Sequence, residues 1–174
     1  MTQPSLRGPR VQLEPLLDAD LEPLGTLLAQ PGVHRWWGDP SPSALRVALL
    51  DASDTLSWSV RVHDELAGAA SAFDAGWPPG STVGLVIALG DAWQDRGLGP
   101  EALSLLVAHY VGRGVHRFSV DPVAENTRAI HAYESCGFRP IGVLRQYDPD
   151  PAGGWRDCLL MDLLAGEFVD RSGG

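Results

Sequence analysis

Lysine is absent from this chain of 174 residues, and asparagine occurs once, at Asn126. All 13 basic residues are therefore arginines, and 22 acidic residues bring the formal net charge to -9. Nucleic acids and anionic membranes are bound by basic surfaces, so this charge argues against both as partners. An acidic balance suits a cationic substrate, although the same balance also keeps a protein in solution without any further role.

Cysteines and long hydrophobic runs are scarce. Cys136 and Cys158 lack zinc-ligand spacing and a Cys-x-x-Cys partner, so we expect buried thiols rather than a disulfide or a metal site. No apolar stretch approaches the roughly eighteen residues of a membrane-spanning helix, and residues 1–10 lack the apolar region of a signal peptide. We therefore expect a cytoplasmic protein without a metal, built as one domain over residues 1–174.

One short segment, Gln94-Asp95-Arg96-Gly97-Leu98-Gly99, has the context of a phosphate-binding turn. It lies between an apolar run at residues 83–89 and an amphipathic helical pattern that begins at Pro100. Glycine permits positive φ and close approach of the backbone, and the first N–H groups of a helix attract anions. The spacing matches neither the dinucleotide fingerprint nor the nucleoside-triphosphate loop. A different phosphate ligand is predicted, and a plain turn is the alternative.

A second block lies downstream, after a strand-like run at residues 116–121. Residues 125–138 read Glu-Asn-Thr-Arg-Ala-Ile-His-Ala-Tyr-Glu-Ser-Cys-Gly-Phe. This block resembles the Asn-x-x-Ala-x-x-x-Tyr-Glu-x-x-Gly-Phe segment of the GCN5-related N-acetyltransferases. The glycine turn resembles the Gln/Arg-x-x-Gly-x-Gly/Ala signature of the same family. The two blocks occur in the family's order and at a fitting distance.

Hydrophobic periodicity by itself predicts a mixed α/β protein. The strand patterns fall at 11–16, 56–63, 66–73, 82–89, 116–121, 138–147 and 155–164, and the helical patterns at 18–30, 43–50, from 100 to 111 and around 129–136. This order is that of the family. The resemblance implies a mostly antiparallel sheet flanked by helices. It also implies that the fourth and fifth strands, 82–89 and 116–121, run parallel and splay apart, which leaves a wedge for the pantetheine arm of the cofactor.

The resemblance also implies acetyl-CoA as the cosubstrate, with its pyrophosphate on the backbone of the glycine turn. Backbone N–H groups near the end of the fourth strand would hold pantetheine and polarise the thioester carbonyl. The cofactor-binding residues implied in this way are Ala88, Leu89, Gln94, Asp95, Arg96, Gly97, Leu98, Gly99, Asn126 and Tyr133. Tyr133 matches the general acid that protonates the leaving sulfur, and its alternative role is that of a core tyrosine.

The acceptor side has its own candidates. Asp121 ends the fifth strand, where a carboxylate could bind an ammonium group and accept its proton; an Asp-Pro turn is the alternative. Asp39 and Asp150 add negative charge from nearby loops, and Trp36 and Trp37 could cover a sugar or an aliphatic chain. Adjacent tryptophans do not face one way, so at least one is expected to be structural.

Aminoglycoside 6′-N-acetyltransferases show the strongest likeness within the family. They share the block from Asp121 to Phe138 and an early Trp-Trp-Gly segment, here residues 36–38, but Val86 stands where they carry a further carboxylate. We therefore predict acetylation of a small cationic amine, with the aminoglycoside 6′-amine first. Siderophore-type hydroxylamines or lysines and protein N-terminal amines are rival substrates. A non-catalytic acyl-CoA- or drug-binding module is the alternative of a different class, and a monomer and a homodimer both remain open.

Overall fold

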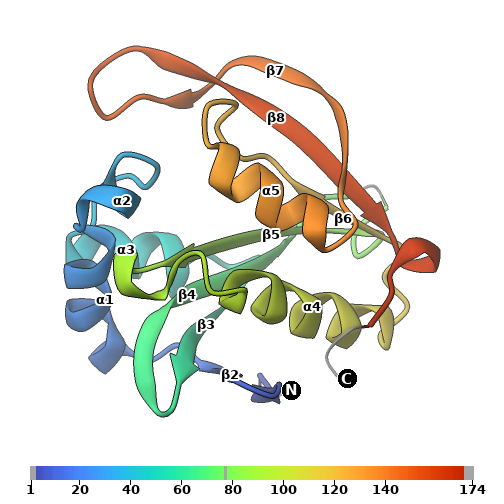
Figure 1. Cartoon of the computed structure of the whole chain (residues 1–174), viewed down its shortest axis with the longest axis horizontal. Coiled ribbons are helices and arrows are strands. Elements are labelled where there is room, and N and C mark those ends of the chain that lie inside the picture. The colour runs from blue at the N-terminus through green and yellow to red at the C-terminus, as the bar shows by residue number, and fades with distance from the viewer. Residues whose placement is uncertain (1–2, 77, 171–174) are drawn as a thin grey trace.

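A computed structural model describes residues 3–76 and 78–170 of the chain (Figure 1). The strands are β1 (Leu6–Arg7), β2 (Val11–Pro15), β3 (Thr55–Val62), β4 (Glu65–Asp74), β5 (Thr82–Leu89), β6 (Arg117–Val120), β7 (Arg139–Pro149) and β8 (Trp155–Leu164). The α-helices are α1 (Leu21–Leu28), α2 (Pro31–His34), α3 (Pro42–Leu49), α4 (Leu98–Val111) and α5 (Thr127–Ser135), and short 3₁₀ turns lie at Asp18–Asp20, Asp91–Trp93 and Ala165–Glu167.

The strands form one eight-stranded sheet in the order β1-β2-β3-β4-β5-β6-β8-β7. The pair β5–β6 is parallel, and the other neighbouring pairs are antiparallel. The expected mixed, mostly antiparallel sheet flanked by helices is therefore confirmed. Two features go beyond the expectation: the short strand β1, and the position of β8 between β6 and β7.

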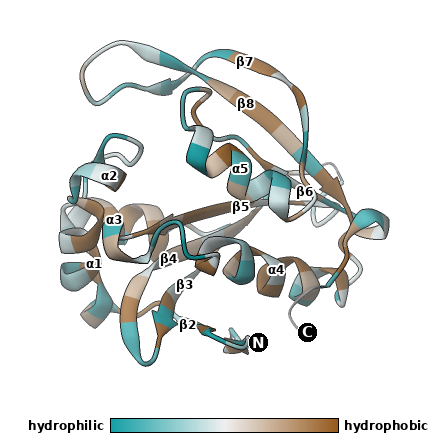
Figure 2. Cartoon of the chain, in the orientation of Figure 1, coloured by the Kyte–Doolittle hydropathy of each residue, from teal (hydrophilic) through white to brown (hydrophobic). Residues whose placement is uncertain are grey.

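Two hydrophobic clusters lie between the sheet and its helices (Figure 2). The larger joins the sheet to α4, whose Leu103, Leu106 and Val107 are fully buried as their helical spacing predicts. The smaller cluster holds α1, α2 and α3 through residues such as Leu24 and Leu45. Helix α4 is thus held to the sheet by the larger cluster, and α1, α2 and α3 by the smaller one.

The helix boundaries correct the sequence prediction in two places. The helical pattern at 18–30 is a 3₁₀ turn followed by the short helix α1, and Pro31 then starts α2, because proline is tolerated at the first helical position. Helix α4 begins at Leu98, two residues before Pro100, with Gly97 as its N-cap. Residues 171–174 of the expected C-terminal tail lie outside the described residues.

The parallel pair β5–β6 is short. Its register joins Thr82–Gly84 to Arg117–Ser119, whereas β5 continues to Leu89. Strand β6 ends at Val120, and Pro122 follows closely; proline has no N–H with which to continue a ladder. The side of β5 that faces away from β4 is therefore left open beyond Gly84, and this splay is the one expected from the family resemblance.

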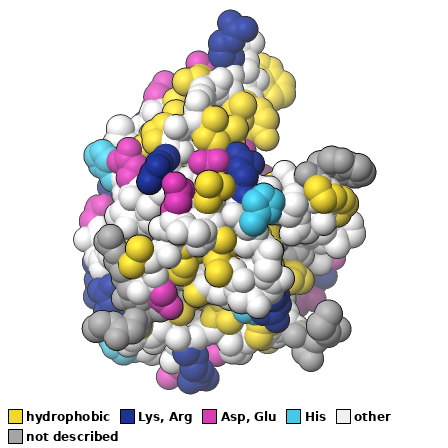
Figure 3. All heavy atoms as spheres, turned by 90° about the vertical axis from the view of Figure 1, so that its right-hand side faces the viewer, with side chains coloured by type: hydrophobic (Ala, Val, Ile, Leu, Met, Phe, Trp, Pro, Cys, Tyr) yellow, Lys and Arg dark blue, Asp and Glu magenta, His cyan; other side chains and the backbone are white. Residues whose placement is uncertain are grey.

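The surface is mixed in character. Figure 3 shows hydrophobic side chains gathered toward the top of one face, where β7 and β8 lie, with acidic and basic side chains interleaved below them. The exposed large hydrophobic residues of this hairpin include Ile141, Val143 and Trp155. Within the described part of the chain, no helix is long and apolar enough to cross a membrane.

Candidate active site

A cavity of about 880 Å³ occupies the splay between β5 and β6. Its walls come from the open half of β5, the glycine turn, the first turns of α5 and the loop that follows β6. The segment after α2 contributes Trp36 and Trp37, and the β7–β8 hairpin contributes Asp148 and Cys158. One cavity therefore contains residues of both the glycine turn and the block at 125–138, together with residues from earlier and later segments of the chain.

The glycine turn has the backbone geometry of an anion site. Gly97 has a φ of 73° and Asp95 a φ of 57°, so the chain curls before α4 begins. The N–H groups of the first turn of this 14-residue helix have no partner within the helix, and the helix dipole adds positive potential there. Gln94, Asp95, Gly97 and Gly99 line the cavity. A phosphate group suits this arrangement.

Two residues of the turn face elsewhere. The Leu98 side chain is buried in the larger core, and the Arg96 guanidinium lies over the Trp93 ring at 5.3 Å from its centre. Arg96 also donates a hydrogen bond to the Ala92 carbonyl at 3.3 Å. Neither side chain lines the cavity, so these two positions can serve a cofactor only through the backbone.

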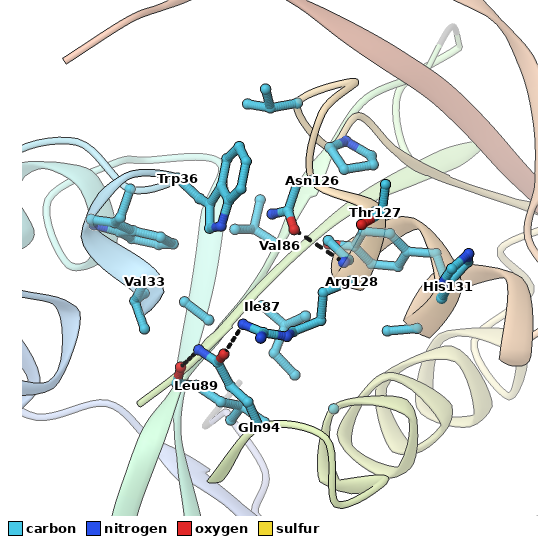
Figure 4. A pocket seen from close by; sticks show the side chains of 18 of the residues that line it. Val33, Trp36, Val86, Ile87, Leu89, Gln94, Asn126, Thr127, Arg128 and His131 are labelled. Atoms are coloured by element: carbon cyan, nitrogen blue, oxygen red, sulfur yellow. Dashed lines mark hydrogen bonds between the residues drawn. The ribbon is translucent and has the colours of Figure 1, made fainter. Parts of the chain in front are cut away.

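Gln94 ties the turn to both sides of the cavity (Figure 4). Its Nε2 donates to the Leu89 carbonyl at 2.8 Å, and its Oε1 accepts a hydrogen bond from Arg128 on α5. Arg128 Nε also lies 3.2 Å from Asp95 Oδ1. Sequence reasoning missed Arg128, although its place on the same helical turn as Asn126 was a usable signal.

Only alternate N–H groups of β5 can face the splay. The N–H of Gly90 donates to the Ala67 carbonyl of β4 at 2.9 Å. Successive N–H groups of a strand point to opposite sides, so the N–H of Ala88 also faces β4, whereas those of Ile87 and Leu89 face the cavity. Both Ala88 and Leu89 line the cavity, and this geometry favours Leu89 over Ala88 as a backbone donor.

Asn126 caps α5, as its position in the sequence block predicts. Its Oδ1 accepts a hydrogen bond from the Ala129 N–H at 3.2 Å, and the residue lines the cavity (Figure 4). The side-chain oxygen of Asn126 thus forms the cap.

Tyr133 and Asp121 lie in the middle of the cavity wall. Tyr133 is buried, packs edge-to-face on Phe138 with ring centres 5.8 Å apart, and has its pKa raised by burial and then by the Asp121 charge. Burial likewise raises the pKa of Asp121, and the nearby Asp148 raises it further, while a hydrogen bond from Tyr147 opposes the shift. A protonated phenol and a carboxylate of increased basicity thus face the same space.

The β7–β8 hairpin supplies residues that sequence reasoning missed. Tyr147 donates a hydrogen bond to Asp121, and the Asp121 charge in turn raises the pKa of Tyr147. Burial, with the charges of Asp148 and Asp121, raises the pKa of Cys158 to about 11. No local pattern points to these positions, because the long hairpin brings them to Asp121.

The aromatic and acidic predictions for the acceptor side have mixed outcomes. Trp36 and Trp37 both line the cavity, and Trp37 also packs on the smaller core, as the structural role expected of one of them requires. Asp39 and Asp150 do not line it. Their carboxylates accept hydrogen bonds from the N–H groups of Ser41 and Ala152, each at 2.9 Å, and so stabilise local turns.

Neither cysteine forms a disulfide, and in the residues that the structure describes no group of three or more His, Cys, Asp or Glu side chains could hold a metal ion. Five histidines occur along the chain, and His131 alone among those described lines the cavity. The groups of the site that the proposed chemistry can use are therefore backbone donors, a phenol and carboxylates.

Comparison with known proteins agrees with this geometry. Residues 10–139 match the model of the acetyltransferase (GNAT) domain, and the chain belongs to this family. Acetyl-CoA is the cosubstrate of the family. The predicted family and fold are thus confirmed, while the roles of individual residues stay predictions.

Among curated relatives, the chain is 38% identical over 77 residues to the ribosomal protein bS18-alanine N-acetyltransferase of Salmonella typhimurium, a match over 44% of this chain and 51% of that protein. It is also 38% identical over 78 residues to mycothiol acetyltransferase of Cellulomonas flavigena, over 43% of this chain and 22% of that protein. The matches therefore span about half and about a fifth of these relatives.

Solved structures match over nearly the whole chain. A T. thermophilus protein described as an acetyltransferase superposes with a TM-score of 0.82 at 27% identity, over 96% of this chain and 92% of its own. Spermidine N-acetyltransferase from Vibrio cholerae, in complex with CoA and spermine, superposes with a TM-score of 0.75 at 19% identity, over 91% and 97%. The second likeness establishes the fold alone.

Proposed function

We propose that this protein transfers the acetyl group of acetyl-CoA to the primary amine of a small cationic molecule. The observation that carries the proposal is the single cavity in which a helix-start anion site, a buried phenol and two carboxylates meet. The cofactor's pyrophosphate would bind the turn at Gly97 and Gly99, and its thioester would lie along the open side of β5.

In the proposed reaction, the substrate ammonium binds beside Asp121 and Asp148, and Asp121 takes its proton directly or through water. The neutral amine attacks the thioester carbonyl carbon while the N–H groups of Ile87 and Leu89 stabilise the oxygen. As the carbon–sulfur bond breaks, the Tyr133 hydroxyl protonates the departing sulfur and the nitrogen loses its second proton to solvent, which gives the neutral amide. The phenolate then regains a proton from solvent, and Asp121 releases to solvent the proton that it took. Burial keeps the phenol protonated throughout the physiological pH range, because it raises the pKa of Tyr133.

For the acceptor, the aminoglycoside 6′-amine is our first proposal. Trp36 could stack on a sugar ring, and Asp121 could bind the amine. Val86 lines β5 where aminoglycoside enzymes carry a carboxylate, but Asp148 offers one from β7. Polyamines and N-terminal alanines are the next candidates, because similar proteins act on spermidine and on a ribosomal protein.

The direct test is release of coenzyme A thiol over a panel of an aminoglycoside, spermidine, an alanine-initiated peptide and a neutral aromatic amine. We expect turnover of at least one cationic amine, with slower or no turnover of the neutral one, and an acetylated product by mass spectrometry. Tight acetyl-CoA binding without thiol release from any amine would instead support the non-catalytic acyl-CoA-binding alternative.

A further inference from the structure

Arg156, the second residue of β8, makes a set of hydrogen bonds that the proposed chemistry does not use. Its side chain is 11% exposed. One terminal nitrogen, Nη1, donates to the Arg35 carbonyl at 2.6 Å. The other, Nη2, donates to the Asp148 carboxylate and, at 3.3 Å, to the Pro149 carbonyl.

These contacts join segments that are far apart in the sequence. Arg35 directly precedes Trp36 and Trp37, which line the cavity, and it lies 121 residues from Arg156. In Figure 1 the tip of the β7–β8 hairpin lies on the same side of the molecule as α2. We call the part of the cavity lined by Trp36, Trp37, Asp121 and Asp148 its acceptor half. Arg156 thus links the two segments that flank this acceptor half.

The start of α2 is tied to the 3₁₀ turn before α4, where the Gly32 N–H donates to Asp91 at 3.3 Å, whereas the tie of the tryptophan turn to β8 comes from Arg156. The N–H groups of Trp36 and Trp37 donate to the Val33 carbonyl, at 2.8 Å and 3.1 Å, within the same turn. Arg35 itself lies over the Trp36 ring at 4.2 Å from its centre. A change at Arg156 would therefore release this turn from β8 without breaking its internal hydrogen bonds.

The positive charge of Arg156 also offsets part of the negative charge of the aspartates near Cys158. Asp148, Asp121 and Asp157 raise the pKa of Cys158, and Arg156 opposes them. Asp121 and Asp148 line the cavity beside the β7–β8 hairpin, whereas the third lining carboxylate, Asp95, pairs with Arg128 at the glycine turn, and the Arg156 guanidinium offsets Asp148. A single negative charge then remains to attract a single substrate ammonium.

The bonding of Arg156 does not look optimised for stability. Its Nε is buried and has no hydrogen-bond partner in the part of the chain that the structure describes. A buried donor left without a partner is destabilising. The planar fork of an arginine is nevertheless the group that reaches a carbonyl on one side and a carboxylate on the other.

We propose that Arg156 is a positioning residue for the acceptor amine, holding the Trp36-Trp37 turn and the Asp148 carboxylate at the acceptor half of the cavity while leaving acetyl-CoA binding untouched. The part of this inference that concerns the amine rests on the proposed function. The part that concerns the turn does not.

The test compares Arg156→Gln and Arg156→Lys with the control Arg117→Gln. Arg117 also forms an ion pair with β8, to Asp162 at 2.9 Å, but neither partner lines the cavity. Hydrogen–deuterium exchange of residues 33–38 should accelerate in both Arg156 variants, since lysine cannot bridge two partners as a planar fork. It should stay at the wild-type rate in Arg117→Gln.

With an accepted amine, Arg156→Gln should raise the KM for that amine by roughly tenfold or more, as expected for loss of hydrogen bonds from a charged group, with kcat changed far less. Calorimetric affinity for acetyl-CoA should be unchanged. Unaltered exchange at residues 33–38 in both Arg156 variants would overturn the proposal. If wild type turns over no amine, the proposed function fails, but the exchange result still decides whether Arg156 holds the turn.

Discussion

At the scale of single residues, Asp121 is the group whose environment most affects the chemistry. It lies at the end of β6, partly buried, with Asp148, Tyr133 and Tyr147 as electrostatic neighbours. Burial and the Asp148 charge raise its pKa from an ordinary value of 3.8, so the carboxylate binds a proton more readily than an exposed aspartate. A proton acceptor benefits from this shift, because its basicity moves toward that of the amine.

The sign of the shift gives a pH prediction. In the proposed mechanism the unprotonated form of Asp121 is the base, so activity should rise with pH through a limb that lies above the ordinary aspartate range. Asp121→Asn removes the proton acceptor, and kcat/KM should fall by about a hundredfold or more, with loss of that limb. The pH profile of kcat/KM, measured for both proteins, provides the check. A near-normal rate and profile in the variant would assign the base elsewhere.

The same shift has a consequence for stability. A raised carboxyl pKa means that the folded state favours the protonated form, so the stability that this group contributes is present below the ordinary pKa and is lost as pH rises through the folded pKa. Asp121→Asn should therefore unfold no more easily than wild type near neutral pH. This separates a loss of activity from a loss of fold.

Tyr133 can be tested by removing one oxygen. Tyr133→Phe keeps the ring that packs on Phe138 and removes the proton donor, so kcat should fall by roughly tenfold to a thousandfold while acetyl-CoA affinity changes little. Tyr110→Phe is the control, because Tyr110 also lies on a helix but is only half-buried and does not line the cavity. Equal activities of the two variants would make Tyr133 a core residue only.

At the scale of elements, the turn that precedes α4 is the proposed binding site for the pyrophosphate of the cofactor. Arg10 of the loop before β2 donates to the Arg96 carbonyl at 2.9 Å and pairs with Glu101 at 2.8 Å, so the outer side of the turn is braced against the sheet. The carbonyls that Arg10 binds point away from the cavity. This bracing favours N–H groups on the inner side, where an anion would bind.

Gly97→Val tests that element. Valine at a φ of 73° is strained, and its Cβ would lie 3.3 Å from Arg10 Nη2, so the backbone of the turn would have to leave the geometry that suits a phosphate. Gly114→Val is the control, because Gly114 has a φ of 86° and open space around it, after the C-terminus of α4. Calorimetry should find acetyl-CoA binding lost in Gly97→Val and kept in Gly114→Val. Equal affinities of the two variants would remove the cofactor from the turn.

Most strands and helices could be predicted from the local sequence, because the spacing of apolar residues within a short segment differs between a strand and a helix. The position of β8 between β6 and β7 could not be derived in this way, since periodicity reports which face is buried and not which strand lies alongside. The pattern at 18–30 forms a 3₁₀ turn and α1, but the short helix α2 was missed, because Pro31 can start a helix as well as end one.

The site residues also differ in whether a local sequence pattern could predict them. The glycine turn, Asn126 and Tyr133 were predictable because each belongs to a compact local motif. Asp148 and Arg156 were not, since the β7–β8 hairpin brings them to the cavity from far along the chain. Asp39 and Asp150 were assigned to the substrate on charge, but an Asp two residues before the N–H it binds already signals a local turn.

At the scale of the whole molecule, the net charge of -9 is less informative than its local distribution. Figure 3 shows both signs interleaved on one face. Inside the cavity, by contrast, Asp121 and Asp148 face the acceptor space, and the nearby Arg156 offsets one of them. Attraction of a cationic amine is therefore expected from these few groups rather than from the surface as a whole.

The overall architecture also argues for direct transfer. The cofactor turn and the acceptor carboxylates open into one cavity, so both substrates can be bound at once. The nucleophilic side chain best placed for a covalent alternative is Cys158, but it is 2% exposed, and its pKa of about 11 keeps the thiol protonated at neutral pH. An acetyl-cysteine intermediate is therefore disfavoured.

The most direct test of this account is the initial-velocity pattern for an accepted amine, measured with acetyl-CoA varied at several fixed amine concentrations. Attack within a ternary complex predicts reciprocal plots that intersect, and the same pattern should persist in Cys158→Ala. Parallel lines, the signature of a substituted enzyme, would contradict direct transfer in a shared cavity.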